Sequence, residues 1–133
     1  WQSLTNYLVK NAKTNSSAVV TKDRKGAKEA RLSFWILSCR EVQEQRMAEA
    51  AGVLGYVLVE IHLATGRHHQ IRVQMAHAGM PLLGDQRYGS EESREVSTQL
   101  GIRTIRLQAV KLAFCHPTSG KRVCYELTDK LTL

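Results

Sequence analysis

The stretch LATGRHHQIRVQMAHAG, residues 63–79, concentrates the side chains of this chain that could do chemistry. It carries two arginines, three histidines and two glutamines among a few apolar residues. A helix at a protein surface needs a polar face, but Lys and Glu usually supply it. The unusual composition makes this segment the candidate functional site.

Helical spacing places Ile71, Met75 and Ala78 on one apolar stripe. Arg72 follows Ile71 directly, so its guanidinium is expected at the boundary of the core. An unpaired buried charge is very costly, and Arg72 therefore requires a carboxylate or a phosphate as partner. The backbone N–H groups at the expected helix start, residues 66–69, also suit an anion.

Two other interpretations of the histidines remain open. His68 and His69 could be a metal pair, but adjacent residues of a helix diverge by about 100°, which does not suit one ion. His62 and His116 are more simply structural histidines. The sequence has no Gly-rich phosphate loop, no H-E-x-x-H and no G-x-S-x-G pattern, so we predict no metal site.

The elements around residues 63–79 must position these side chains. Alternating apolar residues predict a strand over 56–64 that leads directly into the site. Thr65 is expected to cap the following helix, and Gly66 to allow a tight turn before it. Gly79 and Pro81 should end that helix.

The remaining patterns predict a short helix over 4–13 and a strand over 31–39. Residues 40–52 fit a short helix or a loop, and residues 90–106 also fit either. Two strands, 107–114 and 121–127, form a hairpin around a turn that contains Pro, Ser and Gly. This order predicts an α+β fold, with a mixed, largely antiparallel sheet and flanking helices.

The chain is basic, with 19 Lys and Arg against 12 Asp and Glu in 133 residues, a formal charge of +7. Such a charge favours polyanionic partners, nucleic acids above all. The densest basic cluster consists of Lys22, Arg24, Lys25 and Lys28. It is either a solvated hairpin tip or a loop that contacts phosphate.

Cysteine content and hydropathy bear on location. The three cysteines show no C-x-x-C spacing, which argues against a disulfide framework and favours a reducing compartment, the cytoplasm. No apolar run is long enough to span a bilayer, so no membrane partner is expected.

Two segments, LATGRHHQIRVQMAHAGMPLLGDQRYG and RLQAVKLAFCHPTSGKRV, resemble the RluA-type RNA pseudouridine synthases. The hallmark of that family runs Thr-Gly-Arg-Thr-His-Gln-Ile-Arg, Gly-His-Pro, Gly-Asp, Tyr-Gly, Leu-His-Ala and His-Pro. The matching positions are Thr65, Gly66, Arg67, His69, Gln70, Ile71, Arg72, Gly79, Pro81, Gly84, Asp85, Tyr88, Gly89, Leu107, Ala109, His116 and Pro117. The departures are His68, Gln74, Met80 and Gln108.

The resemblance implies an isomerase that converts uridine to pseudouridine in rRNA or tRNA, without metal or organic cofactor, on a flipped base. Arg72 would pair with the catalytic Asp of the family, and Ile71 would line the uracil pocket. Arg67, His69 and Gln70 would shape the site or contact RNA. The basic loop with Lys22, Arg24, Lys25 and Lys28 would follow the RNA backbone.

The motif that carries the catalytic Asp, His-Arg-Leu-Asp, is absent from the sequence, as is the Lys-x-Tyr motif. None of Asp23, Asp85 and Asp129 fits that role. Residues 1–133 are therefore expected to be the C-terminal portion of a catalytic domain, inactive alone. The alternative is a non-catalytic RNA-binding module on the same scaffold. Part of a sheet would also leave an exposed edge, which predicts self-association.

Overall fold

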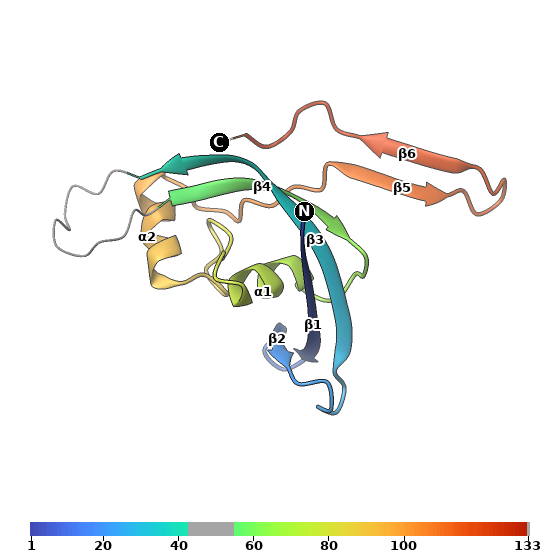
Figure 1. The fold of residues 1–133 in the computed structure, drawn as a ribbon, viewed down its shortest axis with the longest axis horizontal. Coiled ribbons are helices and arrows are strands. Elements are labelled where there is room, and N and C mark those ends of the chain that lie inside the picture. Colours follow the sequence, from blue (N-terminus) through green and yellow to red (C-terminus); the bar gives the residue numbers. More distant parts are fainter. Residues whose placement is uncertain (43–54, 133) are drawn as a thin grey trace.

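A computed structural model of the chain describes residues 1–42 and 55–132. The strands and helices are β1 Gln2–Asn11, β2 Ser16–Val20, β3 Lys28–Glu41, β4 Gly55–Leu63, α1 Gln70–His77, α2 Glu91–Gln99, β5 Lys111–Cys115 and β6 Arg122–Glu126. The first four strands form an antiparallel sheet in the order β2-β1-β3-β4, and β5 pairs with β6 in a hairpin. Strands β3 and β4 arch over α1, and the hairpin extends away from them (Figure 1). The predicted α+β class is confirmed. The expected helix or loop over 40–52 lies mostly outside the described residues.

The prediction of a helix over 4–13 was wrong, because this segment is the strand β1. Leu4 and Leu8 are four residues apart, a spacing that fits one turn of a helix and also one face of a strand. In the structure β1 lies between β2 and β3 and forms backbone ladders with both. These two long-range pairings decide the conformation, and local spacing cannot reveal them.

The core lies between the sheet and α1. Ala30, Leu32 and Phe34 alternate along β3 and face the helix, where Val73 and Met75 meet them. The buried face of α1 therefore differs from the predicted stripe of Ile71, Met75 and Ala78. Ala78 is exposed and Ile71 only half-buried, whereas two glutamines of the helix are buried.

Helix α2 forms a hydrogen bond with the loop that follows α1. The helix begins after Ser90, whose side chain accepts a hydrogen bond from the N–H of Ser93. Buried Ser97 accepts a hydrogen bond from the N–H of Gly84 at 2.9 Å. Gly84 has a φ of +76°, and a Cβ there would lie 2.1 Å from the backbone oxygen of Thr104. The turn after Gly84 is thus fixed between α2 and the segment before β5.

The predicted C-terminal hairpin is confirmed as β5 and β6. Alternation along the two strands puts Leu112, Phe114, Val123 and Tyr125 on one face of the hairpin, and all except half-buried Val123 are exposed. Within residues 1–42 and 55–132, no helix has the length and apolar character needed to cross a membrane.

Candidate active site

The turn from β4 into α1 is held by the buried side chain of Gln70. Its Oε1 accepts hydrogen bonds from the Thr65 hydroxyl and the Arg67 backbone N–H, both at 2.9 Å. Its Nε2 donates to the backbone oxygen of Arg31 on β3 at 3.0 Å. Gln70 was expected to shape the site or to contact RNA; it is only 3 % exposed, and its amide is bound by protein groups. Its observed role is to position the turn.

Helix α1 also begins later than expected. The residue before its first turn is His69, with left-handed backbone geometry at φ 54°, ψ 25°. Thr65 does not cap the helix, because its hydroxyl accepts a hydrogen bond from the N–H of Arg31 at 2.8 Å. The sequence places Gly66 in the tight turn, yet the left-handed conformation in this segment belongs to His69.

Arg72 is paired with Asp85. Its Nε donates to Oδ2 and its Nη2 to Oδ1, both at 2.8 Å, which is the bidentate geometry of a guanidinium and a carboxylate. The Asp85 side chain is 0 % exposed and that of Arg72 is 22 % exposed. The expected need of Arg72 for an anion was thus correct. The structure supplies Asp85 as one such anion, because the turn after Gly84 folds back onto α1. The pairing of Arg72 with an aspartate from outside the chain stays a prediction.

Asp85 is fully engaged by its surroundings. Besides Arg72, Oδ1 accepts hydrogen bonds from the backbone N–H groups of Arg87 and Tyr88, at 3.0 and 3.1 Å. Burial alone would raise the pKa of Asp85, but the hydrogen bonds from Arg72, Tyr88 and Arg87 outweigh it and hold the pKa below its ordinary value. Asp85 is therefore ionised at neutral pH and inaccessible as a base or nucleophile.

His69 lies between Arg72 and Tyr88. Its Nε2 is 3.3 Å from Nη1 of Arg72, and its Nδ1 is 2.9 Å from the Tyr88 hydroxyl. A guanidinium can only donate, so Nε2 accepts and the proton of the neutral ring belongs on Nδ1. Burial, and then the charges of Arg72, His68 and Arg87, lower the pKa of His69. The ring is therefore neutral and its tautomer is set by Arg72.

A second histidine completes this cluster. His68 stacks on His69 with ring centroids 3.8 Å apart, and its Nδ1 lies 2.9 Å from the hydroxyl of Ser17 on β2. Burial, followed by the charge of Lys10, lowers the pKa of His68. The Tyr88 hydroxyl accepts a hydrogen bond from the Ser17 N–H at 2.8 Å, so β2 is tied to the same site.

A cavity of about 210 Å³ opens beside these residues. Its lining residues are Leu63, Gly66, Arg67, His69, Gln70, Ile71, Arg72 and Leu107. Three apolar side chains form much of the wall, and Arg72 places a positive charge at its edge. Such a site suits a small planar ring and a nearby anion. Ile71, predicted to line a uracil pocket, and the other residues predicted for this helix start therefore border one cavity.

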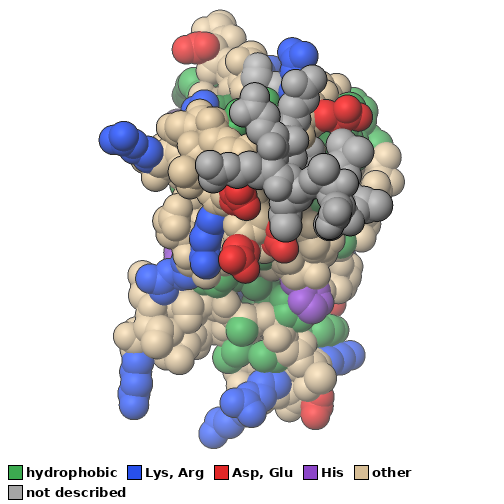
Figure 2. Space-filling view, turned by 90° about the vertical axis from the view of Figure 1, so that its left-hand side faces the viewer, with side chains coloured by type: hydrophobic (Ala, Val, Ile, Leu, Met, Phe, Trp, Pro, Cys, Tyr) green, Lys and Arg blue, Asp and Glu red, His purple; other side chains and the backbone are tan. Residues whose placement is uncertain are grey.

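The basic loop lies at the start of β3. Lys22, Arg24, Lys25 and Lys28 are all exposed, and Lys28 directly precedes Glu29. The backbone oxygen of Glu29 accepts a hydrogen bond from Nε of Arg67 at 2.8 Å, which connects this loop to the rim of the cavity. Lys and Arg side chains (blue) project from the lower end of the molecule, where the β1–β2 and β2–β3 turns lie (Figures 1 and 2).

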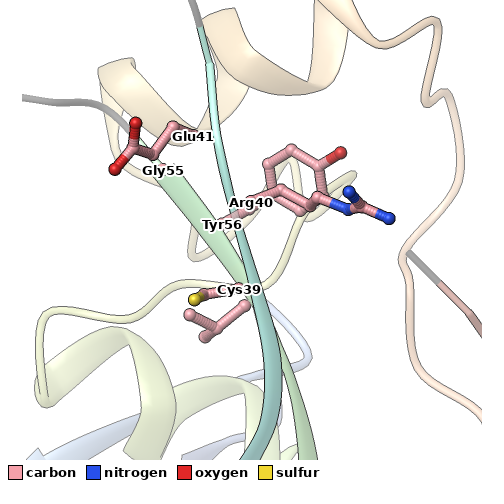
Figure 3. A pocket seen from close by; sticks show the side chains of 6 residues that line it. Cys39, Arg40, Glu41, Gly55 and Tyr56 are labelled. Carbon is pink, nitrogen blue, oxygen red and sulfur yellow. The ribbon is translucent and has the colours of Figure 1, made fainter.

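A second hollow lies at the far end of β3 and β4, with Cys39, Arg40 and Glu41 facing Gly55, Tyr56 and Val57 (Figure 3). None of the side chains discussed above lines it. It is therefore separate from the candidate site.

Several residues that build the site had no predicted role. Asp85 and Tyr88 belong to the Gly-Asp and Tyr-Gly pairs already noted, and these pairs were the available signal. Ser17 carries no local signal, because β2 reaches α1 only through tertiary folding. Leu107 was read as part of a strand, yet it lines the cavity.

The chain is similar to several known proteins. No protein-family model matches the chain. An uncharacterised RNA pseudouridine synthase of Aquifex aeolicus (strain VF5) is 35 % identical over 112 residues, 82 % of this chain and 32 % of the relative. The ribosomal large subunit pseudouridine synthase D of Neisseria meningitidis serogroup A is 42 % identical over 79 residues, 55 % of this chain and 21 % of the relative.

The tRNA pseudouridine synthase C of Pasteurella multocida (strain Pm70) is 38 % identical over 69 residues, 51 % of this chain and 28 % of the relative. Among solved structures, human RNA pseudouridylate synthase domain containing 1 superposes with a TM-score of 0.67 at 21 % identity, over 96 % of this chain and 48 % of that one. The chain thus spans about a third or less of the length of these curated relatives.

Proposed function

Because the chain belongs to the RluA-type RNA pseudouridine synthases, we propose that residues 1–133 are the C-terminal portion of a catalytic domain that isomerises uridine in rRNA or tRNA. The observation that supports this most strongly is the cavity in which Ile71 adjoins a guanidinium fixed by Asp85. In the reaction the bond from the ribose to nitrogen is broken, the uracil turns, and it rejoins the ribose through carbon.

Each part of the site has a task in this proposal. The target base leaves its stack and enters the cavity, where Leu63, Ile71 and Leu107 contact its faces. Arg72 orients the carboxylate that performs the chemistry, through the parallel hydrogen bonds that a guanidinium gives. Arg67 and the basic loop bind the phosphates on either side of the flipped nucleotide.

The carboxylate that performs the chemistry comes from outside these residues. Asp85 is buried and bound to Arg72, and neither Asp23 nor Asp129 lines the cavity. The isolated chain should accordingly bind RNA without forming pseudouridine. Pseudouridine produced by the isolated chain would overturn this assignment.

Photochemical cross-linking tests the cavity directly. RNA that contains 4-thiouridine should cross-link to residues 63–72 of the isolated chain, as mapped by mass spectrometry. Ile71→Glu places a charge in the apolar wall and should abolish these cross-links. Ile36→Glu is the matched control, because Ile36 is 51 % exposed on β3 and does not line the cavity. Cross-links that survive Ile71→Glu unchanged would contradict the proposed pocket.

The edge of β4 and the three cysteines bear on self-association and on the location of the protein. β4 is at one end of the strand order, and its outer edge is suited to pairing with a second copy. A sedimentation profile that stays monomeric as concentration rises would count against this pairing. We place the protein in the cytoplasm, because all three cysteines are free thiols and a reducing compartment maintains that state.

A further inference from the structure

Buried Asp85 pairs with Arg72 but does not line the cavity, so it takes no direct part in the proposed chemistry. A carboxylate with a 0 % exposed side chain is rare in a protein unless it is paired. Asp85 receives its partners from two directions: the backbone of its own turn and the side chain of Arg72. This turn is itself held against α2, because the N–H of Gly84 donates a hydrogen bond to the side chain of Ser97. The carboxylate is therefore part of a rigid frame.

The contacts of Arg72 use one edge of its guanidinium. Nε and Nη2 together bind the two oxygens of Asp85, and Nη1 faces Nε2 of His69. The Tyr88 ring covers a face of the same group, with its centroid 4.9 Å from Cζ. Only the end formed by Nη1 and Nη2 still carries N–H groups without an acceptor among residues 1–42 and 55–132. These N–H groups lie in the plane of the guanidinium and point away from the edge that binds Asp85.

We infer that Asp85 is a positioning residue, which holds the Nε edge of Arg72 so that the Nη1–Nη2 end is presented to a second carboxylate at the cavity. Arg72 would then bridge two carboxylates, a permanent one from the turn after Gly84 and one that belongs to the reacting system. The ring of His69 accepts a hydrogen bond from Nη1 without adding a competing negative charge. This inference rests on the proposed function, because it explains how the site holds its catalytic aspartate.

Acetate is a suitable probe for the second carboxylate, and ¹⁵N NMR of the 133-residue chain can distinguish the nitrogens of Arg72. In the wild-type chain, acetate should shift the Nη resonances in a saturable way and leave Nε unchanged. The Nε–H should also exchange slowly, since it donates to a buried carboxylate. Acetate that shifts Nε and Nη together, or that shifts neither, would overturn the inference.

Asp85→Asn removes the charge with little change of shape. In this variant the Nε–H should exchange about tenfold faster or more, and acetate should now shift Nε as well as Nη. If Asp85 only neutralises the charge of Arg72, acetate should bind Asp85→Asn more tightly than the wild type but still shift only the Nη resonances. That result would refute a positioning role for Asp85. Asp129→Asn is the matched control, because Asp129 is exposed and should leave both readouts unchanged.

A second variant keeps the test informative where Asp85→Asn does not fold. Arg72→Lys retains a positive charge but has no planar fork, so the saturable acetate response, read here from the backbone amides of residues 66–72, should disappear. An acetate response equal to that of the wild type would place the site elsewhere and refute the inference. These readouts need neither RNA nor product formation. If the cross-linking test fails while acetate shifts the Nη resonances as expected, the proposed function is refuted and the positioning role of Asp85 is not.

Discussion

The ion pair between Arg72 and Asp85 gives a prediction for stability that can be worked from the structure. Removal of one partner of a buried ion pair typically costs about 3–5 kcal/mol, because the other charge is left unpaired. The Arg72 side chain is 22 % exposed, so water can solvate part of the abandoned guanidinium. In Asp85→Asn the amide oxygen can still accept from the N–H groups of Arg87 and Tyr88. We therefore expect a loss of about 2–3 kcal/mol at pH 7, below the full cost of a buried pair.

The pH dependence of this loss has a definite sign. The folded pKa of Asp85 is lowered, so its contribution is fully present above the unfolded pKa of about 3.9 and is lost as pH falls through the folded value. The difference between wild type and Asp85→Asn should stay constant from pH 7 to about pH 5 and shrink below about pH 4. The other carboxylates titrate in both proteins, so the difference isolates Asp85.

Urea unfolding followed by circular dichroism measures this difference. With a slope of about 1–3 kcal/mol per molar urea, the midpoint should fall by roughly 0.7–3 M. Asp129→Asn has the same charge change at an exposed position and should leave the midpoint nearly unchanged. A loss in unfolding free energy below about 0.5 kcal/mol for Asp85→Asn, or a loss that is the same at pH 3 as at pH 7, would refute this role of the ion pair.

Two further predictions concern the frame of the site and the basic loop. Gly84→Ala should lower the melting temperature strongly, because its Cβ would lie 2.1 Å from a backbone oxygen. Gly101 has a similar φ of +67° but no atom within 4 Å of an added Cβ, so Gly101→Ala should lower the melting temperature far less. Equal decreases for the two variants would refute the steric argument. Lys22→Ala and Lys25→Ala should each weaken RNA binding and reduce the salt dependence of its affinity by about one counterion. Lys121→Ala, at the exposed tip of the β5–β6 hairpin, should change fluorescence anisotropy titrations little, and an effect as large as that of Lys22→Ala would contradict the assignment of the loop.

The sequence predicted the site better than it predicted the packing around it. Helical spacing placed Arg72 at the boundary of the core and required an anion for it, and the structure has both. The identity of the anion depended on how residues 84–89 fold back, which involves Ser97 and the backbone near Thr104. Contacts of this kind are set by tertiary structure, so local patterns could not supply Asp85.

Buried polar groups explain the remaining differences. Gln74 is 0 % exposed and donates to Asn6 at 2.8 Å and to the backbone oxygen of Ala30 at 3.1 Å. A sequence pattern assigns glutamine to the solvent face of a helix. The predicted stripe therefore included Ile71 and Met75, which contact the core, but missed buried Gln70 and Gln74. Likewise Leu4 and Leu8 suited both a helix and a strand, and only pairing with β2 and β3 distinguished the two.

The most direct test of the central claim is pseudouridine formation by a chimera. The segment of the Neisseria large subunit synthase that aligns with this chain, 79 residues, can be replaced by the matching residues of this chain. The chimera is expected to form pseudouridine in large subunit rRNA. Arg72→Ala in the chimera should abolish this activity, and Asp129→Asn should not. A chimera that folds and binds this RNA but forms no pseudouridine, or one that stays fully active with Arg72→Ala, would contradict the account.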